Sequence, residues 1–145
     1  MGKDRTRRSE ALASELREVA TELRARLRAS SADSMPMSQS SALAQLFKAG
    51  PMTVADLARA EHVKPQSTGV TVALLEEEGL VKREADPSDG RRLHVLMTEK
   101  GKRQFLAGRT VRQAWLSQAL EERLSDAEQK QLHDALSLLR KALAP

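Results

Sequence analysis

The 145-residue sequence contains no cysteine, few aromatic residues and no long apolar run. Without cysteine, disulfides, thiol catalysis and cysteine-rich zinc sites are excluded. Phe47, Phe105 and Trp115 are the only aromatic residues, which argues against a protein that stacks single-stranded bases on aromatic side chains. No run of about 18 apolar residues is present, so we expect no membrane partner. The N-terminal residues lack the apolar stretch of a secretory signal, which favours a cytoplasmic location.

The usual signatures of catalysis are also missing. We find no glycine-rich phosphate loop and no H-E-x-x-H pattern, and Ser, His and Asp occur in no recognisable catalytic arrangement. His62, His94 and His133 are scattered along the chain, whereas a metal site needs clustered ligands. The sequence therefore predicts a protein that is not an enzyme and has no metal and no cofactor.

The composition is that of a single globular domain. Apolar residues make up 40% of the chain and charged residues 30%, and the length fits one domain. The formal net charge is +4, which permits a polyanionic partner without requiring one.

Both ends of the chain have helical periodicity. Residues 9–29 predict an amphipathic helix, preceded by a basic start (residues 1–8) that we expect to be disordered. Its apolar positions are Leu12, Leu16, Val19, Leu23 and Leu27. The helical period returns after residue 99, and Ser125 with Glu128 predicts a capping box that begins the last helix. The apolar stripe of that helix is Leu132, Leu136, Leu139 and Leu143.

Three shorter helices and a hairpin are predicted between these ends. Ser38 is the expected cap of a helix that ends at Gly50, and Thr53 begins the next, which ends near Glu61. A three-residue connector then leads to Pro65, a favoured first residue for a helix that runs to Glu78.

The period changes after this helix. Residues 86–90 (Asp-Pro-Ser-Asp-Gly) are typical of a turn, and residues 92–98 alternate in polarity as a strand does. The fold class is therefore mainly α with one small β-hairpin.

The two helices joined by the short connector predict a helix-turn-helix. In this motif the second helix enters the major groove by its N-terminal end, where short polar side chains reach base edges. The residues expected to do so are Lys64, Gln66, Ser67, Thr68 and Thr71. Arg91 and Arg92 at the hairpin tip predict a wing that places arginine in the minor groove. From residue 79 to 103 seven basic residues outnumber four acidic ones, so much of the net charge lies in this segment.

The series Leu-Glu-Glu-Glu-Gly-Leu-Val-Lys-Arg (75–83), followed by Asp-Pro-Ser-Asp-Gly-Arg-Arg (86–92) and Met-Thr-Glu-Lys-Gly (97–101), resembles the MarR family of winged-helix repressors. The resemblance covers essentially the whole chain. It implies that Arg91 enters the minor groove, and that Asp89 pairs with it and supports the wing together with Arg83. Gly69 and Val70 depart from the family, which often has Thr or Ser followed by Arg there; the departure leaves the half-site sequence open.

The resemblance also implies a homodimer that binds double-stranded DNA. A helical dimerisation region (9–30 and 99–143) would join two winged lobes (38–98), with half-sites roughly 34–36 Å apart in a pseudo-palindromic operator. The terminal helices each have an apolar face, which is consistent with a dimerisation region because such a face needs a partner surface. The expected function is a sequence-specific, ligand-responsive repressor; a DNA-binding or architectural protein without an effector is the alternative. Trp115 is either part of a pocket for a small aromatic or anionic effector or a core or dimer contact.

Overall fold

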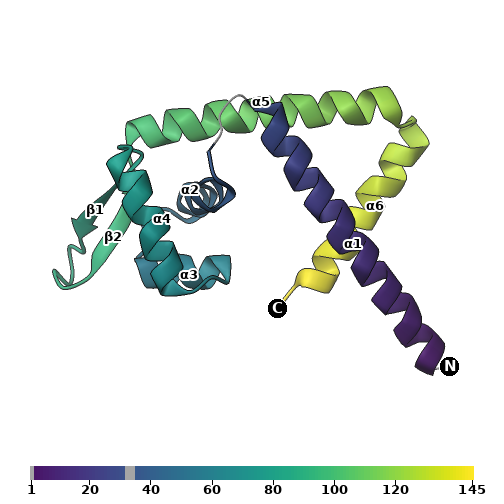
Figure 1. The fold of residues 1–145 in the computed structure, drawn as a ribbon, viewed down its shortest axis with the longest axis horizontal. Coiled ribbons are helices and arrows are strands. Elements are labelled where there is room, and N and C mark those ends of the chain that lie inside the picture. Colours follow the sequence, from purple (N-terminus) through teal and green to yellow (C-terminus); the bar gives the residue numbers. More distant parts are fainter. Residues whose placement is uncertain (1, 32–34) are drawn as a thin grey trace. The chain divides into compact units, whose positions relative to one another are not determined.

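The computed structural model describes residues 2–31 and 35–145, and in them it shows helices and one β-hairpin (Figure 1). This confirms the mainly α fold class. The helices are α1 (Gly2–Ser30), α2 (Met37–Ala49), α3 (Val54–Glu61), α4 (Pro65–Glu77), α5 (Glu99–Arg123) and α6 (Asp126–Leu143). The strands are β1 (Val81–Ala85) and β2 (Leu93–Met97), paired antiparallel. Among the described residues, no helix combines the length and apolarity needed to cross a lipid bilayer.

The chain forms two compact units. The winged lobe comprises residues 32–110, and the helical unit comprises residues 1–31 and 111–145. The lobe thus reaches beyond residue 98, where the sequence pattern places its end, because the first part of α5 carries Phe105 into the lobe's core.

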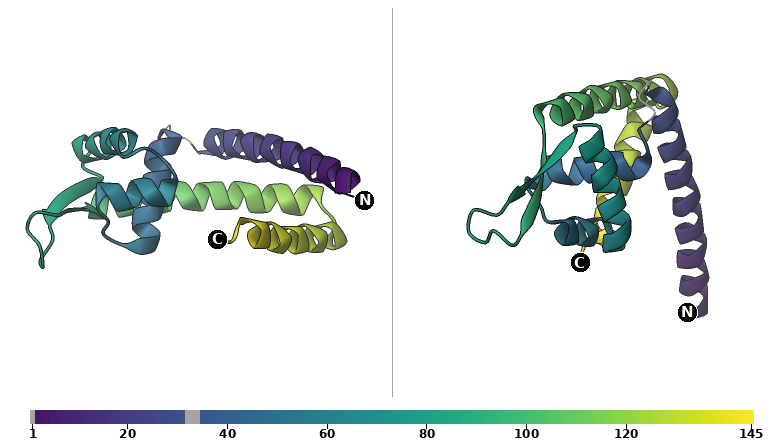
Figure 2. Two further views of the ribbon diagram at one scale, coloured as in Figure 1. Left: turned by 90° about the horizontal axis from the view of Figure 1, so that it is seen from below. Right: turned by 60° about the vertical axis from the view of Figure 1, so that its left-hand side comes forward.

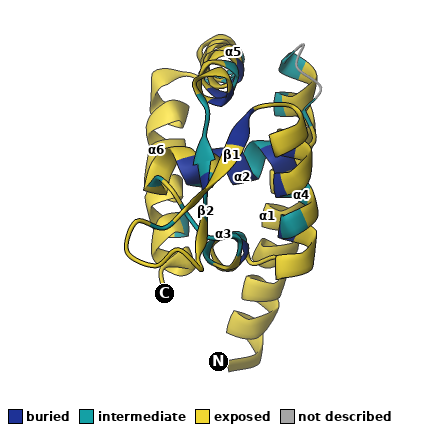
Figure 3. Ribbon diagram, turned by 90° about the vertical axis from the view of Figure 1, so that its left-hand side faces the viewer, coloured by how far each residue is buried: buried dark blue, intermediate teal, exposed yellow. Residues whose placement is uncertain are grey.

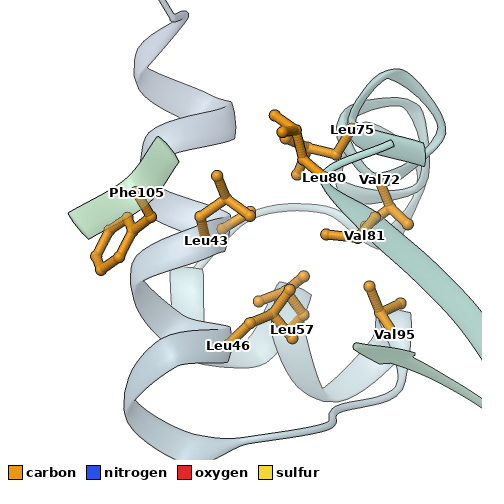
Figure 4. Close-up of a cluster of buried hydrophobic side chains, with 10 residues drawn as sticks. Leu43, Leu46, Leu57, Val72, Leu75, Leu80, Val81, Val95 and Phe105 are labelled. Atoms are coloured by element: carbon orange, nitrogen blue, oxygen red, sulfur yellow. The ribbon is translucent and has the colours of Figure 1, made fainter. Parts of the chain in front are cut away.

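The core of the winged lobe is built from every element of that lobe. Leu43 and Leu46 come from α2, Leu57 from α3, and Val72 and Leu75 from α4, and all are buried. The remaining labelled members are Leu80, Val81 and Val95 from the hairpin and its base, and Phe105 from α5, which lies beside α2 (Figure 4). Burial of these side chains holds α3 and α4 in their mutual orientation and fixes the base of the hairpin.

Two predicted helix starts are wrong. The helix expected at residue 9 begins at Gly2, so residues 2–8 are helical rather than disordered. Nothing between residues 3 and 9 breaks a helix, and an i,i+4 ion pair joins Arg8 to Asp4. The second helix begins at Met37 after Pro36, whose carbonyl accepts a bond from the Ser40 N–H, so Ser38 is not its cap.

The hairpin is anchored at its base on both sides. Backbone bonds join Met52 to Val95 in both directions, which ties β2 to the segment before α3. At the other end, the Thr98 hydroxyl donates to the Gly79 carbonyl at 2.6 Å and accepts the Gly101 N–H at 3.0 Å. The β-hairpin projects from the helices of the lobe (Figure 2). These bonds therefore fix the base of the wing to the rest of the lobe.

The helical unit has a different character. Neither α1 nor α6 contains a buried residue, and both are exposed along most of their length (Figure 3). The predicted capping box of α6 is confirmed: the Ser125 side chain accepts the Glu128 N–H, and the Glu128 carboxylate accepts the Ser125 N–H at 2.8 Å. Local capping thus defines where α6 begins, although no residue that the structure describes buries its apolar face.

Candidate nucleic-acid interface

The turn between α3 and α4 follows from local signals in the sequence. The Thr53 side chain accepts the Asp56 N–H at 3.1 Å and caps α3. At the other end, His62 adopts a left-handed conformation (φ 54°) and its N–H donates to helix carbonyls, which ends α3. Lys64 is extended and Pro65 occupies the first turn of α4, where its missing N–H costs nothing. The predicted helix-turn-helix is therefore present.

Helical geometry decides which side of α4 is available to a partner. The buried residues Thr68, Val72 and Leu75 occupy one face, at i, i+4 and i+7. The opposite face carries Gln66 and Val70, four residues apart and both exposed. This outward face is the one that a second helix of a helix-turn-helix presents to the major groove.

The predicted contact residues of α4 do not all lie on that face. Lys64, Gln66 and Ser67 are exposed. Thr68 is only 4% exposed and its hydroxyl donates to the Lys64 carbonyl, so the structure does not favour it as a base contact. Thr68 is polar, but it lies at a core position of the helix and satisfies its hydroxyl within the turn.

Ser67 and Thr71 border a depression beside α4. It has a volume of about 240 Å³ and is also lined by residues of α2 and the end of α3, among them Ser41 and Glu61. The Ser41 hydroxyl donates to the Glu61 carboxylate, and the Thr71 hydroxyl donates to the Ser67 carbonyl. Ser67 and Thr71 therefore lie on the flank of α4 rather than at the centre of its outward face.

Sequence reasoning missed Val70 as a candidate contact. It is 60% exposed in the middle of the outward face, one turn after Gln66. The predicted contact residues were chosen as polar side chains, and Val70 is apolar. The helical position of Val70 relative to the Thr68, Val72 and Leu75 stripe is the signal that could have found it.

The wing tip is organised around the Asp86 carboxylate. Its Oδ1 accepts the Ser88 hydroxyl at 2.6 Å and the Ser88 N–H at 2.7 Å. These bonds, led by the hydroxyl, hold the pKa of Asp86 below its ordinary value of 3.8, with a smaller contribution from His94. The other carboxylate oxygen lies 3.4 Å from His94 Nε2 on β2. The Asp86 N–H also donates to the Arg92 carbonyl, so one residue closes the turn through backbone and side chain.

Arg91 and Arg92 lie at this braced tip. Both are exposed, and within residues 2–31 and 35–145 no acidic side chain forms an ion pair with either guanidinium. Asp89 accepts the backbone N–H of Arg91 at 3.1 Å, so it supports the turn through the main chain rather than by the expected ion pair. The two positive charges remain available to an anionic partner.

Arg83 supports the wing from its other end. Its Nε lies 3.3 Å from a carboxylate oxygen of Glu76, which joins β1 to the last part of α4. An exposed ion pair of this kind contributes little to stability, so the shared core is the main link between helix and wing. The two elements expected to read DNA are thus joined by a polar contact as well as by the core.

Two other predicted features concern ligands. Within the part of the chain that the structure describes, no three acidic, histidine or cysteine side chains come together as a metal site. In the helical unit, Trp115 is half-buried and lines a shallow depression of about 230 Å³ with Arg26, Arg123, Leu23 and others. This depression combines an aromatic ring with two guanidinium groups.

A helix-turn-helix whose second helix has a free outward face, followed by a hairpin with unpaired arginines at its tip, defines a winged helix-turn-helix DNA-binding protein. The chain belongs to the MarR family of transcriptional regulators. A profile described as "MarR family" matches residues 35–93, which span the helix-turn-helix and most of the wing.

Individual relatives agree with this assignment. An HTH-type transcriptional regulator of Mycobacterium tuberculosis is 38% identical over 103 residues, 71% of each chain. The structure of a MarR family protein from Bacillus stearothermophilus superposes with a TM-score of 0.82 at 28% identity, covering 94% of this chain and 96% of that one. Bordetella bronchiseptica BpsR, whose DNA binding is regulated by 6-hydroxynicotinic acid, shares the fold with a TM-score of 0.72 at 21% identity, over 92% and 93% of the two chains.

Proposed function

We propose that this regulator is a homodimeric repressor that binds a pseudo-palindromic operator. Lys64, Gln66 and the outward face of α4 would occupy the major groove, and Arg91 and Arg92 would reach the adjacent minor groove or its phosphates. The observation that carries the proposal is the braced wing tip with two exposed, unpaired guanidinium groups. These groups fill no core, and a polyanion is the partner that their charge fits.

The dimer is supported by the helical unit. Leu12 is 64% exposed and belongs to an apolar stripe on α1, and Leu136 is 44% exposed and belongs to a stripe on α6. An amphipathic helix gains stability mainly by burying its apolar face, so both stripes require a partner surface. A second copy supplies identical stripes around a two-fold axis and would set the half-sites roughly 34–36 Å apart.

The operator assignment is tested with full-length protein and a duplex selected by that protein from a randomised library. Arg91→Ala is expected to weaken binding by about tenfold and to flatten the salt dependence, because one cationic contact is lost. Arg140→Ala, an exposed arginine on α6, is the matched control and should bind as wild type does. Equal affinity of Arg91→Ala and wild type would show that the wing does not contact DNA.

Ligand response is the second part of the proposal. The depression around Trp115 offers an aromatic ring and the Arg123 guanidinium, which fits a small aromatic carboxylate, while its Arg26 guanidinium is paired with Glu22 at 3.5 Å. Trp115 is the single tryptophan, so its fluorescence reports on this depression directly. Titration with 6-hydroxynicotinic acid or salicylate should change the emission and weaken binding to the selected duplex. Unchanged emission and DNA affinity would favour the effector-independent alternative.

A further inference from the structure

Helix α4 contains two adjacent residues that disfavour a helix, Gly69 on its flank and Val70 on its outward face. Gly69 costs about 1 kcal/mol relative to alanine, and Val70 loses side-chain entropy because it is β-branched. Neither residue is explained by packing within the chain. A Cβ atom at Gly69 would meet no heavy atom within 4 Å, and Val70 is 60% exposed. The reason for this pair therefore lies in what approaches α4 from outside.

The position of Val70 on the helix limits what it can touch. It lies opposite the buried stripe and directly follows Gln66 by one turn, within the first two turns of α4. The N-terminal turns of a recognition helix are the part that contacts base edges in the major groove. An apolar side chain there cannot exchange hydrogen bonds with bases or phosphates. The major groove displays one apolar group that distinguishes a base, the C5-methyl of thymine.

We propose that Val70 reads a thymine C5-methyl group in each half-site, and that Gly69 leaves room for the helix backbone to approach the bases. The inference rests on the proposed operator function and adds a specificity-determining residue to it. Gln66, on the same face, would then read a neighbouring base pair.

The test replaces single thymines by deoxyuridine in the duplex selected from a randomised library by full-length protein. Deoxyuridine removes only the C5-methyl group and keeps the pairing. One such substitution, in one half-site, is expected to weaken wild-type binding by about threefold to fivefold, the effect of burying one methyl group. Val70→Ala preserves the helix, and with it the same substitution should change affinity by less than about twofold. Val111→Ala, another exposed helical valine, is the control and should keep the full methyl dependence.

The outcomes separate this inference from the function on which it rests. A selected duplex whose binding depends on no thymine methyl, or a methyl dependence that Val70→Ala leaves intact, overturns the role of Val70 alone. Failure to select any duplex overturns the operator function and the role of Val70 together. Loss of the methyl dependence in Val70→Ala but not in Val111→Ala supports the role of Val70.

Discussion

The winged lobe and the helical unit differ in how their apolar residues are satisfied. In the lobe, leucines and valines from three helices and both strands are fully buried around one centre. In the helical unit, α1 and α6 bury no residue, although both carry apolar stripes. Burial within one chain therefore specifies the lobe, whereas the apolar stripes of α1 and α6 remain exposed and are the surface that the proposed dimer would bury.

This difference separates two parts of the function. The core of the lobe packs α4 against the base of the wing, and the Arg83–Glu76 ion pair also joins the two elements. The helical unit would set the distance between two such lobes. Under the proposed function, recognition of one half-site would be a property of the single chain, and recognition of a complete operator would be a property of the dimer.

The largest effect is expected from a change that breaks the lobe. A Cβ atom at Gly101 would lie 2.0 Å from the Leu80 carbonyl oxygen, a backbone atom that cannot move aside without disturbing the hairpin base. Gly101→Ala is expected to lower the free energy of unfolding by about 3 kcal/mol or more, measured by urea denaturation.

The matched control is Gly69→Ala, which has open space around the added methyl group. It should raise the free energy of unfolding by roughly 0.5–1 kcal/mol, because alanine favours the helix. A Gly101→Ala variant as stable as wild type would mean that α5 does not press against Leu80 and that the lobe is less tightly closed than the structure shows.

Local signals predicted much of the lobe. Thr53 caps α3, Pro65 begins α4, and the Asp86–Gly90 turn closes the hairpin. These residues act through their own backbone preferences or through bonds to near neighbours, so their effect is visible in a single sequence. The start of α1 was missed because a charged, polar segment was interpreted as disordered.

The candidate site was less predictable, because polarity and position disagree in α4. Thr68 is polar but buried, and Val70 is apolar but exposed. A selection based on side-chain chemistry therefore included the first and omitted the second. The face of α4 that points outward depends on how α4 packs against α2 and α3, which is a tertiary property. The helical spacing of Thr68, Val72 and Leu75 identifies the opposite, core-facing side.

The next effect concerns the helical unit and leaves the lobe intact. Leu136→Glu places a charge in the apolar stripe of α6, where a second copy would have to bury it. Wild type is expected to have twice the 16.0 kDa chain mass by light scattering at micromolar concentration, and the variant to be monomeric. Affinity for the selected duplex should fall by at least about tenfold, because two half-sites are no longer bound together.

The control for this change is Leu138→Glu, which adds the same charge to α6 away from the stripe. It should remain dimeric and bind the duplex as wild type does. A single 16.0 kDa species for wild type, or an unaltered dimer for Leu136→Glu, would contradict the role given to the helical unit.

The smallest effect concerns the local capping that defines α6. Bonds from the Ser125 N–H and hydroxyl hold the pKa of Glu128 below its ordinary value of 4.5. A lowered pKa means that the ionised carboxylate stabilises the folded state above the ordinary pKa, and that this stabilisation is lost as the pH falls from 4.5 through the lower folded value. Ser125→Ala should cost about 1 kcal/mol of stability at neutral pH.

The pH dependence distinguishes capping from a general effect of the substitution. The stability difference between wild type and Ser125→Ala, measured by urea denaturation, should be constant near neutral pH and shrink below pH 4.5 as Glu128 gains a proton. Ser117→Ala, an exposed serine within α5, should show no such dependence. A difference that stayed constant down to pH 3 would show that the Glu128 carboxylate does not help to hold the start of α6.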